Sequence, residues 1–248
     1  MAEGRVRIGL FILCYNIETQ IRGTLRAIPP AVYDRADAVL LIDNHSTDRT
    51  VAVSREAIGK FGLTKIEVIE NPRNLGYGGS HKVAFDALIR AGMDYALLYH
   101  GDGQGDPEAL AQLIQWCEKR RYDFIIGSRF LSPGGLSAEY PWSRRLANLV
   151  LVSLQSWVSG MRITDPGSGQ VAYSLQLLRS VPYHDLTDEF HFTPQLLLWC
   201  SRRPVVCKEI PVAWGSVLVS SVNVWRHGWS MLRLLAGHRL KSPRAHGA

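Results

Sequence analysis

The chain has 248 residues, of which 46% are hydrophobic and 20% are charged. This is the composition of an ordinary globular protein with a substantial core, and the sequence has no low-complexity segment, repeat or block of like charge that would indicate a disordered, fibrous or repeat protein. The net charge of +6 indicates an anionic partner such as a nucleotide, a phospholipid or a nucleic acid. Much of the basic excess lies late in the chain, at Arg226, Arg233, Arg239, Lys241 and Arg244.

The cysteines and the apolar runs indicate the cellular compartment in which the protein works. Cys14, Cys117, Cys200 and Cys207 form neither a CxxC pair nor a cluster with zinc spacing, so we expect reduced thiols, as in cytosolic proteins. The N-terminal residues show no apolar segment typical of a signal peptide. The most apolar long run, 146–161, is interrupted by polar residues and falls short of the roughly 20 apolar residues that a spanning helix needs. These features predict a cytoplasmic protein.

Continuously apolar runs alternate with segments of helical periodicity through the first half of the chain. The apolar runs predict buried strands over 6–13, 38–43, 65–70, 95–99 and 122–128. The segments between them predict helices over about 17–28, 48–60, 77–91 and 107–120. This alternation predicts a Rossmann-like α/β fold, in which helices cover both faces of a mainly parallel central sheet.

The pattern loosens after residue 130. The elements expected there are a loop over 132–143, an amphipathic helix to about 160, a polar turn over 164–170, a helix over about 187–201, an edge strand with prolines over 204–214 and a helix over about 223–240. No linker-like segment separates these parts, so we expect a single domain.

Three polar clusters follow predicted strands at the point where each strand ends. They are 14–16, 43–48 and 100–106. In parallel sheets, ligands bind beyond the carboxyl ends of the strands. The clusters therefore predict one shared site.

The segment His100-Gly-Asp-Gly-Gln-Gly-Asp-Pro contains groups that suit a hard cation. Asp102 and Gln104 are two residues apart in a turn and can both reach one Mg²⁺ or Mn²⁺, and His100 would add a ligand that suits Mn²⁺ better. The alternative is a glycine turn in which Asp106 caps the next helix, with Pro107 in its first turn, and Asp102 is solvated. Spacing alone does not decide between them.

Two further loops carry candidate ligand-binding groups. Asp43 can accept hydrogen bonds from a base or a ribose, whereas Ser46 and Asp48 are equally good helix caps. The glycines of 71–82 allow backbone to approach an anion at a helix N-terminus, or make a tight turn. His81 replaces the third glycine of a dinucleotide fingerprint, and no phosphate P-loop motif occurs in the chain.

Three arginines and one aspartate in the second half of the chain are further candidate ligand-binding residues. Arg129 follows a predicted strand, and Arg144 and Arg145 begin a predicted helix; guanidinium groups suit phosphate oxygens, although surface salt bridges are the more common use. Asp165, in the 164–170 turn, is explained most simply as a turn former.

Together, the order and spacing of these pieces over about residues 7–235 resemble family 2 glycosyltransferases of the GT-A fold, in particular the dolichyl/polyprenyl-phosphate mannose synthase-like group. The matching pieces are ILCYNIE (12–18), LLIDNHSTDRT (40–50), NPRNLGYGGSHKVAF (71–85), HGDGQGDPE (100–108), IIGSRF (125–130), RRLAN (144–148), TDPGSGQ (164–170) and EIPVAW (209–214). The resemblance implies one GT-A domain over 1–248, with a nucleotide-binding half to about 130, an acceptor half over about 131–222 and the amphipathic helix over about 223–240.

The resemblance also implies roles for individual residues. Those that would bind the donor are Tyr15, Asn16, Glu18, Asp43, Ser46, Gly76, Gly78, Arg144 and Arg145. Asp102, assisted by Gln104 and His100, would hold the Mg²⁺ or Mn²⁺ that bridges the donor diphosphate. Arg129 would meet phosphates, and Asp165 would lie on the acceptor side as a base or an orienting group. The family's D-x-D motif has His100 in place of its first aspartate, which lowers the local negative charge by one unit.

The implied activity is that of a metal-dependent, inverting hexosyltransferase. It would move a sugar from a UDP-, GDP- or dTDP-linked donor to a polyprenyl phosphate at the cytosolic membrane face. Trp225, Trp229, Leu232 and Ala236 would lie on one face of the last helix, either on a membrane surface or in the core. The alternatives are a soluble polysaccharide, peptide or natural-product acceptor, and a nucleotide-sugar-binding protein without turnover. We expect no nucleic-acid partner, because no binding module is recognisable.

Overall fold

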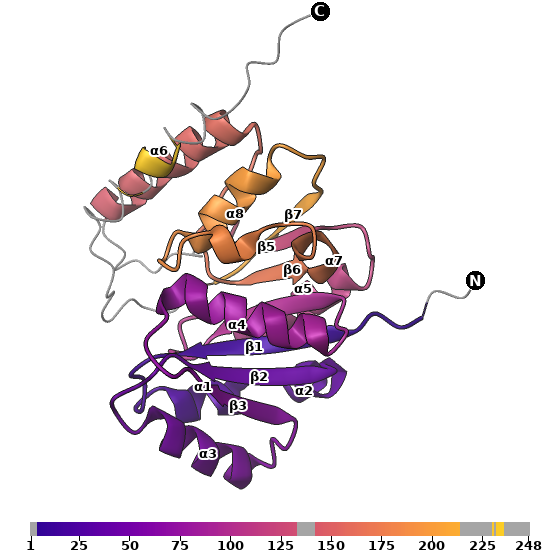
Figure 1. Ribbon diagram of the computed structural model, residues 1–248, viewed down its shortest axis with the longest axis vertical. Coiled ribbons are helices and arrows are strands. Elements are labelled where there is room, and N and C mark those ends of the chain that lie inside the picture. Colours follow the sequence, from indigo (N-terminus) through magenta and orange to yellow (C-terminus); the bar gives the residue numbers. More distant parts are fainter. Residues whose placement is uncertain (1–3, 133–141, 214–229, 231, 236–248) are drawn as a thin grey trace, which may run out of the picture.

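The computed structural model describes residues 4–132, 142–213, 230 and 232–235 (Figure 1). Its strands form one sheet in the order β3-β2-β1-β4-β6-β5-β7. The strands are β1 (Ile8–Cys14), β2 (Ala38–Asp43), β3 (Ile66–Glu70), β4 (Tyr95–His100), β5 (Phe124–Ser128), β6 (Val171–Ser174) and β7 (Cys207–Pro211). The helices are α1 (Ile21–Ala27), α2 (Pro30–Arg35), α3 (Thr50–Phe61), α4 (Gly76–Arg90), α5 (Pro107–Cys117), α6 (Trp142–Ser159), α7 (Leu175–Leu178) and α8 (Phe192–Cys200), with a short 3₁₀ helix over Tyr183–Asp185.

The sheet confirms the expected mainly parallel arrangement. Strands β1 to β4 pair in parallel with their neighbours, and β7 pairs in parallel with β5 at the sheet edge. Strand β6 is the exception, because it lies between β4 and β5 and runs antiparallel to both. Strands from both halves of the chain thus share one sheet.

Alternate residues of each strand enter two different apolar clusters. Leu10 and Ile12 of β1 pack with α1, α2, α3 and α5, whereas Phe11 faces the cluster formed with α4, α7 and α8. Residues Leu41 and Leu40 of β2 divide in the same way. This period of two places helices on both faces of the sheet, as Figure 1 shows.

Some element boundaries differ from the sequence-based expectations. The helix expected over 17–28 begins at Ile21, because residues 17–20 form a turn, and Pro30 then begins the unexpected helix α2. The expectation also omitted β6 and α7, which occupy 171–178. The edge strand with prolines is confirmed as β7, and it is shorter than predicted.

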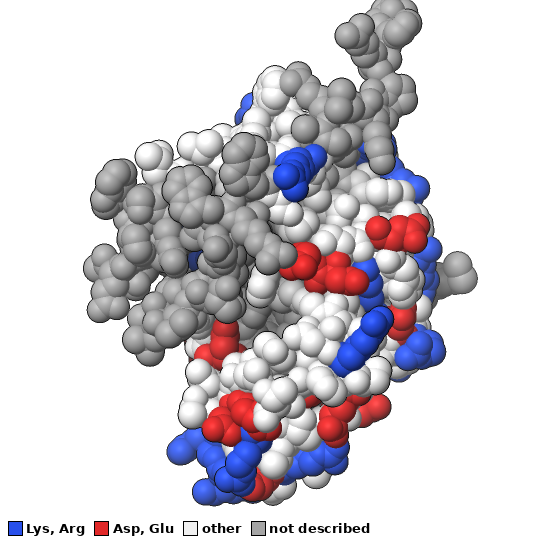
Figure 2. Space-filling model, turned by 60° about the vertical axis from the view of Figure 1, so that its left-hand side comes forward, with Lys and Arg blue, Asp and Glu red and all other residues white. Residues whose placement is uncertain are grey.

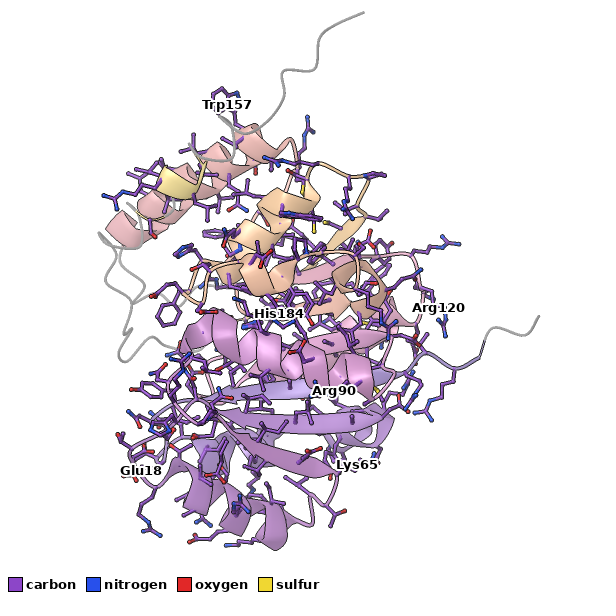
Figure 3. The ribbon with its side chains drawn as sticks, viewed as in Figure 1. Glu18, Lys65, Arg90, Arg120, Trp157 and His184 are labelled. Carbon is purple, nitrogen blue, oxygen red and sulfur yellow. The ribbon has the colours of Figure 1, made fainter. Side chains whose placement is uncertain are left out.

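The carboxyl ends of the parallel strands lie at one edge of the sheet. In Figure 3, Glu18, which follows β1, lies at the left, whereas Lys65 and Arg120, which precede β3 and β5, lie at the opposite side. The expected C-terminal helix over about 223–240 falls almost wholly outside the described residues; Ser230 and residues 232–235 are helical. Within the part of the chain that the structure describes, no helix combines the length and apolarity needed to cross a membrane.

Candidate active site

The loops that follow β1 and β2 are tied together by hydrogen bonds. The Asp43 carboxylate accepts from Ser46 N at 2.9 Å and from Ser46 Oγ at 2.5 Å. Ser46 Oγ in turn accepts from Asn16 N at 2.9 Å, and Asn16 Oδ1 accepts from Thr47 N at 2.8 Å. Asp43 is 2% exposed, so Ser46 satisfies a carboxylate that is buried at the strand end. The sequence-predicted residues Asn16, Asp43 and Ser46 thus lie together.

The other two residues predicted in these loops differ in their surroundings. Tyr15 is 47% exposed, directly beyond the end of β1, where its ring can cover a planar ligand. Glu18 Oε2 accepts a hydrogen bond from Arg49 N at 2.8 Å, just before α3. Through this bond, Glu18 holds the loop after β1 to the loop after β2. Its assignment to donor binding stays a prediction.

Two buried asparagines, Asn44 and Asn71, continue the site from the end of β2 to the end of β3, and sequence reasoning missed their contacts. Asn71 Nδ2 donates to Asn44 Oδ1 at 3.1 Å and to Ser80 Oγ at 3.2 Å. Asn44 Nδ2 donates to Asn74 Oδ1 at 2.8 Å, and Asn44 Oδ1 also accepts from Leu75 N. Asn44 and Asn71 directly follow β2 and β3, and a polar residue at the end of a strand is the signal that identified Asp43.

The glycines at the start of α4 pack against the backbone of residues 187–188. Gly78 N donates to Asp188 O at 2.7 Å. A Cβ on Gly76 would collide with Asp188 O, and one on Gly78 would collide with Thr187 O. Gly76 also has a φ of 78°, which disfavours other residues. Close packing therefore explains both glycines, and their contact with a nucleotide stays a prediction.

The 100–106 loop after β4 lies beside the end of β1. A Cβ on Gly101 would lie 2.8 Å from Cys14 Sγ, and Thr24 Oγ1 of α1 donates to Gly101 O at 2.8 Å. Asp102 Oδ1 accepts from Gln104 N at 3.0 Å, which closes a tight turn. Burial, then the carboxylates of Asp43 and Asp102, raise the pKa of the Cys14 thiol. Asp43 lies opposite Cys14 in the sheet, and Gly101, next to Asp102, packs against the Cys14 sulfur.

The expected cap at the end of this loop is confirmed. Asp106 Oδ1 accepts from Glu108 N at 3.0 Å, and Pro107 is the first residue of α5. Asp106 Oδ2 also accepts from Ala213 N at 3.3 Å, beyond the end of β7. The cap residue thus also joins the loop to the edge of the sheet.

His100 lies on the α4 side of the loop. Its ring stacks on Tyr77, with 5.8 Å between centroids and 14° between planes. A Cβ on Gly169 would collide with His100 Nε2, so this edge of the ring lies against the 164–170 turn. Burial lowers the pKa of His100, opposed by Asp102 and by a hydrogen bond with the Gly169 backbone. Its imidazole is therefore neutral, the form that binds metals, but its Nε2 side faces the turn.

A divalent cation fits this loop only with ligands supplied by a substrate. Among the described residues, no group of three or more His, Cys, Asp or Glu side chains is placed to hold a metal. Asp102 and Gln104 offer one carboxylate and one amide oxygen, and Mg²⁺ commonly takes one or two carboxylates, with phosphate oxygens and waters completing its shell. The donor set therefore suits a nucleotide-bound cation.

Arg129 and Asp165, from different loops, form an ion pair in which the aspartate is buried and the arginine is largely buried. Arg129 Nε donates to Asp165 Oδ2 at 2.7 Å and Nη2 donates to Oδ1 at 2.8 Å; the side chains are 13% and 2% exposed. Glu209 of β7 supports the pair, because its Oε1 accepts from Thr164 N, Thr164 Oγ1 and Asp165 N. A carboxylate held in this way is suited to orienting Arg129, and much less to removing a proton.

The predicted basic groups of α6 lie outside the described side chains. Arg144 and Arg145 belong to the first turn of α6, and only their backbone is described. Of the late basic residues, Arg233 is described and exposed. Around α3, at the bottom of Figure 2, basic and acidic side chains adjoin one another, as in the pairs Arg22–Glu56 and Arg55–Glu70.

Comparison with solved structures supports the fold. The chain is similar to glucosyl-3-phosphoglycerate synthase from Mycobacterium tuberculosis, solved in complex with Mn²⁺, UDP and phosphoglyceric acid, with a TM-score of 0.72 over 99% of this chain and 82% of that chain and 16% identity. This likeness confirms the expected GT-A fold.

Sequence comparison identifies relatives along most of the chain. The "UDP-N-acetylglucosamine--dolichyl-phosphate N-acetylglucosaminyltransferase" of Methanococcus voltae is 23% identical over 83% of this chain and 84% of its own length. The "Undecaprenyl-phosphate mannosyltransferase" of Micrococcus luteus is 26% identical over 94% of this chain and 100% of its own length. The model of the family described as "Glycosyl transferase family 2" matches residues 10–178, which include every loop of the site up to the 164–170 turn. The chain belongs to glycosyltransferase family 2.

Proposed function

We propose that this enzyme transfers a sugar from a nucleotide-sugar donor to a polyprenyl phosphate, with a divalent cation and with inversion at the anomeric carbon. The observation that carries the proposal is the pairing of Asp165 with Arg129. Asp165 is committed to Arg129 by this pair, so in this proposal Arg129 is offered to phosphate and Asp165 does not serve as a general base. An acceptor that is already an anion needs no such base. The names of the two relatives, both transferases to polyprenyl-type phosphates, agree with that acceptor.

The donor would lie across the ends of β2, β1 and β4. These ends are in register, with Cys14 opposite Asp43 and Leu13 opposite His100. Asp43 would accept from the base or the ribose, Tyr15 would cover the base, and Asp102 with Gln104 would face the diphosphate. UDP-, GDP- and dTDP-sugars are all candidate donors in this proposal, because the choice of base would depend on backbone contacts in the 14–18 and 40–46 loops.

Negative charge develops on the leaving diphosphate during the transfer, and the cation and the arginines would stabilise it. An oxygen of the lipid phosphate attacks the anomeric carbon on the face opposite the diphosphate, a new carbon–oxygen bond forms, and the bond to the leaving nucleoside diphosphate breaks. A cation at Asp102 and Gln104 would supply Lewis-acid stabilisation of the leaving diphosphate. Arg129 is fixed by Asp165 and, with Arg144 or Arg145, would offer guanidinium groups to donor or acceptor phosphates. An α-linked donor then gives a β-linked product.

The proposal also assigns parts of the chain to the two substrates. Residues to about 130 would bind the nucleotide, residues of about 131–222 would bind the acceptor, and the helix over about 223–240 would follow them in one domain. A polyprenyl acceptor is a membrane component, so the enzyme would work as a peripheral protein on the inner face of the membrane.

Release of nucleoside diphosphate tests the function. UDP-, GDP- and dTDP-sugars are supplied with Mg²⁺ or Mn²⁺, with and without polyprenyl phosphate in detergent. We expect release that needs both the cation and the lipid and that falls at least roughly a hundredfold in Asp102→Ala. Asp34→Asn, at an exposed position of α2, is the matched control and should retain activity.

Two other results would contradict the proposal. Release that is equally fast without lipid, or that needs a soluble acceptor such as a phosphorylated hydroxy acid, would reject the polyprenyl phosphate. Metal-dependent nucleotide binding without release under any condition would indicate a binding protein.

A further inference from the structure

The 164–170 turn links two parts of the candidate site that follow different strands. At its start, Asp165 holds Arg129, which follows β5. At its end, Gly169 and Gln170 contact the 100–106 loop, which follows β4. The turn leads directly into β6, and β6 lies between β4 and β5 in the sheet. Its position therefore spans the gap between the two loops.

Gln170 makes a reciprocal pair of hydrogen bonds with the backbone of Asp106. Gln170 Nε2 donates to Asp106 O at 2.6 Å, and Gln170 Oε1 accepts from Asp106 N at 3.1 Å. The Gln170 side chain is fully buried, so neither bond is readily replaced by water. Of the side chains of this length, an amide offers both a donor and an acceptor, which match the backbone C=O and N–H of one residue.

Gly169 brings the same turn against His100. Its φ is 75°, and a Cβ there would occupy the place of His100 Nε2. The turn therefore contacts the 100–106 loop at both of its ends, through His100 and through Asp106. Asp102 and Gln104 lie between these two contacts.

The Arg129 end of the turn is fixed just as firmly. Glu209 Oε1 accepts from Thr164 N at 2.7 Å and from Thr164 Oγ1 at 2.8 Å. Thr164 Oγ1 also bonds Ser128 Oγ at 2.6 Å, next to Arg129. The turn is thus attached to both loops through side chains that are buried or partly buried.

We propose that the 164–170 turn is a brace that sets the position of Arg129 relative to the 100–106 loop, and that Gln170 is a positioning residue of the transferase. The proposal rests on the proposed function, in which a cation at the loop and Arg129 act on phosphates of the same reaction. Such groups must be held together closely, since a displacement of about 1 Å can lower a rate by roughly a hundredfold.

Gln170→Ala in the full chain tests the brace, with Gln155→Ala as its control. Gln155 is also a buried glutamine that donates to a backbone carbonyl, that of Pro194, but it lies in α6 away from both loops. We expect Gln170→Ala to lower kcat by roughly tenfold or more with the donor KM within about threefold, because positioning acts on the transition state. Gln155→Ala should leave both constants unchanged.

Hydrogen–deuterium exchange provides a readout that does not depend on turnover. Gln170→Ala should speed amide exchange several-fold in 101–106, which Gln170 touches, and also in 128–130, which it does not touch. Gln170→Glu keeps the side-chain size and sets an acceptor against Asp106 O, so it should give the same pattern if the alanine variant folds poorly. Faster exchange in 101–106 alone would contradict the proposal that the turn acts as a brace. An unchanged kcat of Gln170→Ala in an active enzyme would contradict it as well. If the unmodified chain releases no nucleoside diphosphate, the proposed function fails. The hydrogen–deuterium exchange result alone then tests whether the turn couples the two loops.

Discussion

Asp165 binds Arg129 through two parallel hydrogen bonds of 2.7 and 2.8 Å and accepts a third from the Arg129 backbone N–H at 3.1 Å. The carboxylate is thereby committed to one partner. Three of the five guanidinium N–H groups lie outside this pair, two on Nη1 and one on Nη2. The pair thus orients a cationic group at the end of β5 while the aspartate itself stays buried.

Removal of the aspartate should destabilise the protein. Asp165→Ala leaves a guanidinium that is 13% exposed without its carboxylate, and we expect a loss of about 3 kcal/mol in the free energy of unfolding. Urea denaturation measures this loss. Glu70→Ala, which breaks the exposed pair with Arg55, is the control and should cost less than about 1 kcal/mol. Equal losses in the two variants would contradict the structural role of the buried pair.

Replacement of Arg129 by lysine should lower activity while preserving charge. A lysine cannot reproduce the two parallel bonds to Asp165, so its ammonium group has no fixed direction. We expect kcat to fall by roughly tenfold to a hundredfold. The measurement is steady-state release of nucleoside diphosphate, with Arg55→Lys as the exposed control. An Arg129→Lys enzyme with full activity would show that only the charge matters.

Metal removal should abolish activity without unfolding the protein. The described residues contain no preformed group of three metal-binding side chains of the His, Cys, Asp and Glu types. Mn²⁺ alone should therefore leave the melting temperature unchanged, whereas Mn²⁺ with a nucleoside diphosphate should raise it. Thermal unfolding with EDTA, with Mn²⁺, with nucleotide and with both makes the comparison. A large rise with Mn²⁺ alone would indicate a structural metal site.

The pH dependence of stability should include a contribution from His81. Burial lowers the pKa of His81 to about 3, well below the value of about 6.5 in an unfolded chain. Between these values the unfolded state binds more protons, so stability should fall as the pH decreases from 6.5, by up to about 1.4 kcal/mol per pH unit.

His81→Phe isolates this contribution. Its ring would sit among the rings of Phe11, Tyr77, Phe85 and Phe192 that surround His81. Stability measured by urea unfolding should fall between pH 6.5 and pH 5, and this fall should be smaller by about 1.6 kcal/mol in the variant than in the unmodified protein. Equal pH slopes in the two proteins would mean that His81 does not titrate on unfolding.

Glycine substitutions separate packing from ligand binding. Gly78→Ala would drive its Cβ into Thr187 O and close to Phe192 Cβ, and we expect a loss of at least about 2 kcal/mol in the absence of nucleotide. Gly59→Ala, in α3, meets nothing within 4 Å and should stabilise the protein by about 0.5–1 kcal/mol. A Gly78→Ala protein with unchanged stability but weakened nucleotide binding would restore the ligand explanation.

The strands and the polar clusters at their ends were predictable because they depend on local sequence. Long apolar runs identified β1 to β5, and the rule for parallel sheets brought Asp43 and the 100–106 loop to one edge. Strand β6 has only four residues and is specified by its neighbours β4 and β5, so no local signal identified it. The ties of the brace were missed for the same reason, since Gln170 lies 64 residues from Asp106, and Glu209 lies 45 from Thr164.

The place of β6 in the sheet has a consequence for the order of folding. Strands β1 to β4 pair with one another without any residue beyond His100, so this part of the sheet can assemble from the first part of the chain. Strand β5 joins them only through β6, which is synthesised more than 40 residues later. On a ribosome, the pairing of β5 with the rest of the sheet therefore waits for β6, so the strand that precedes Arg129 enters the sheet together with the 164–170 turn.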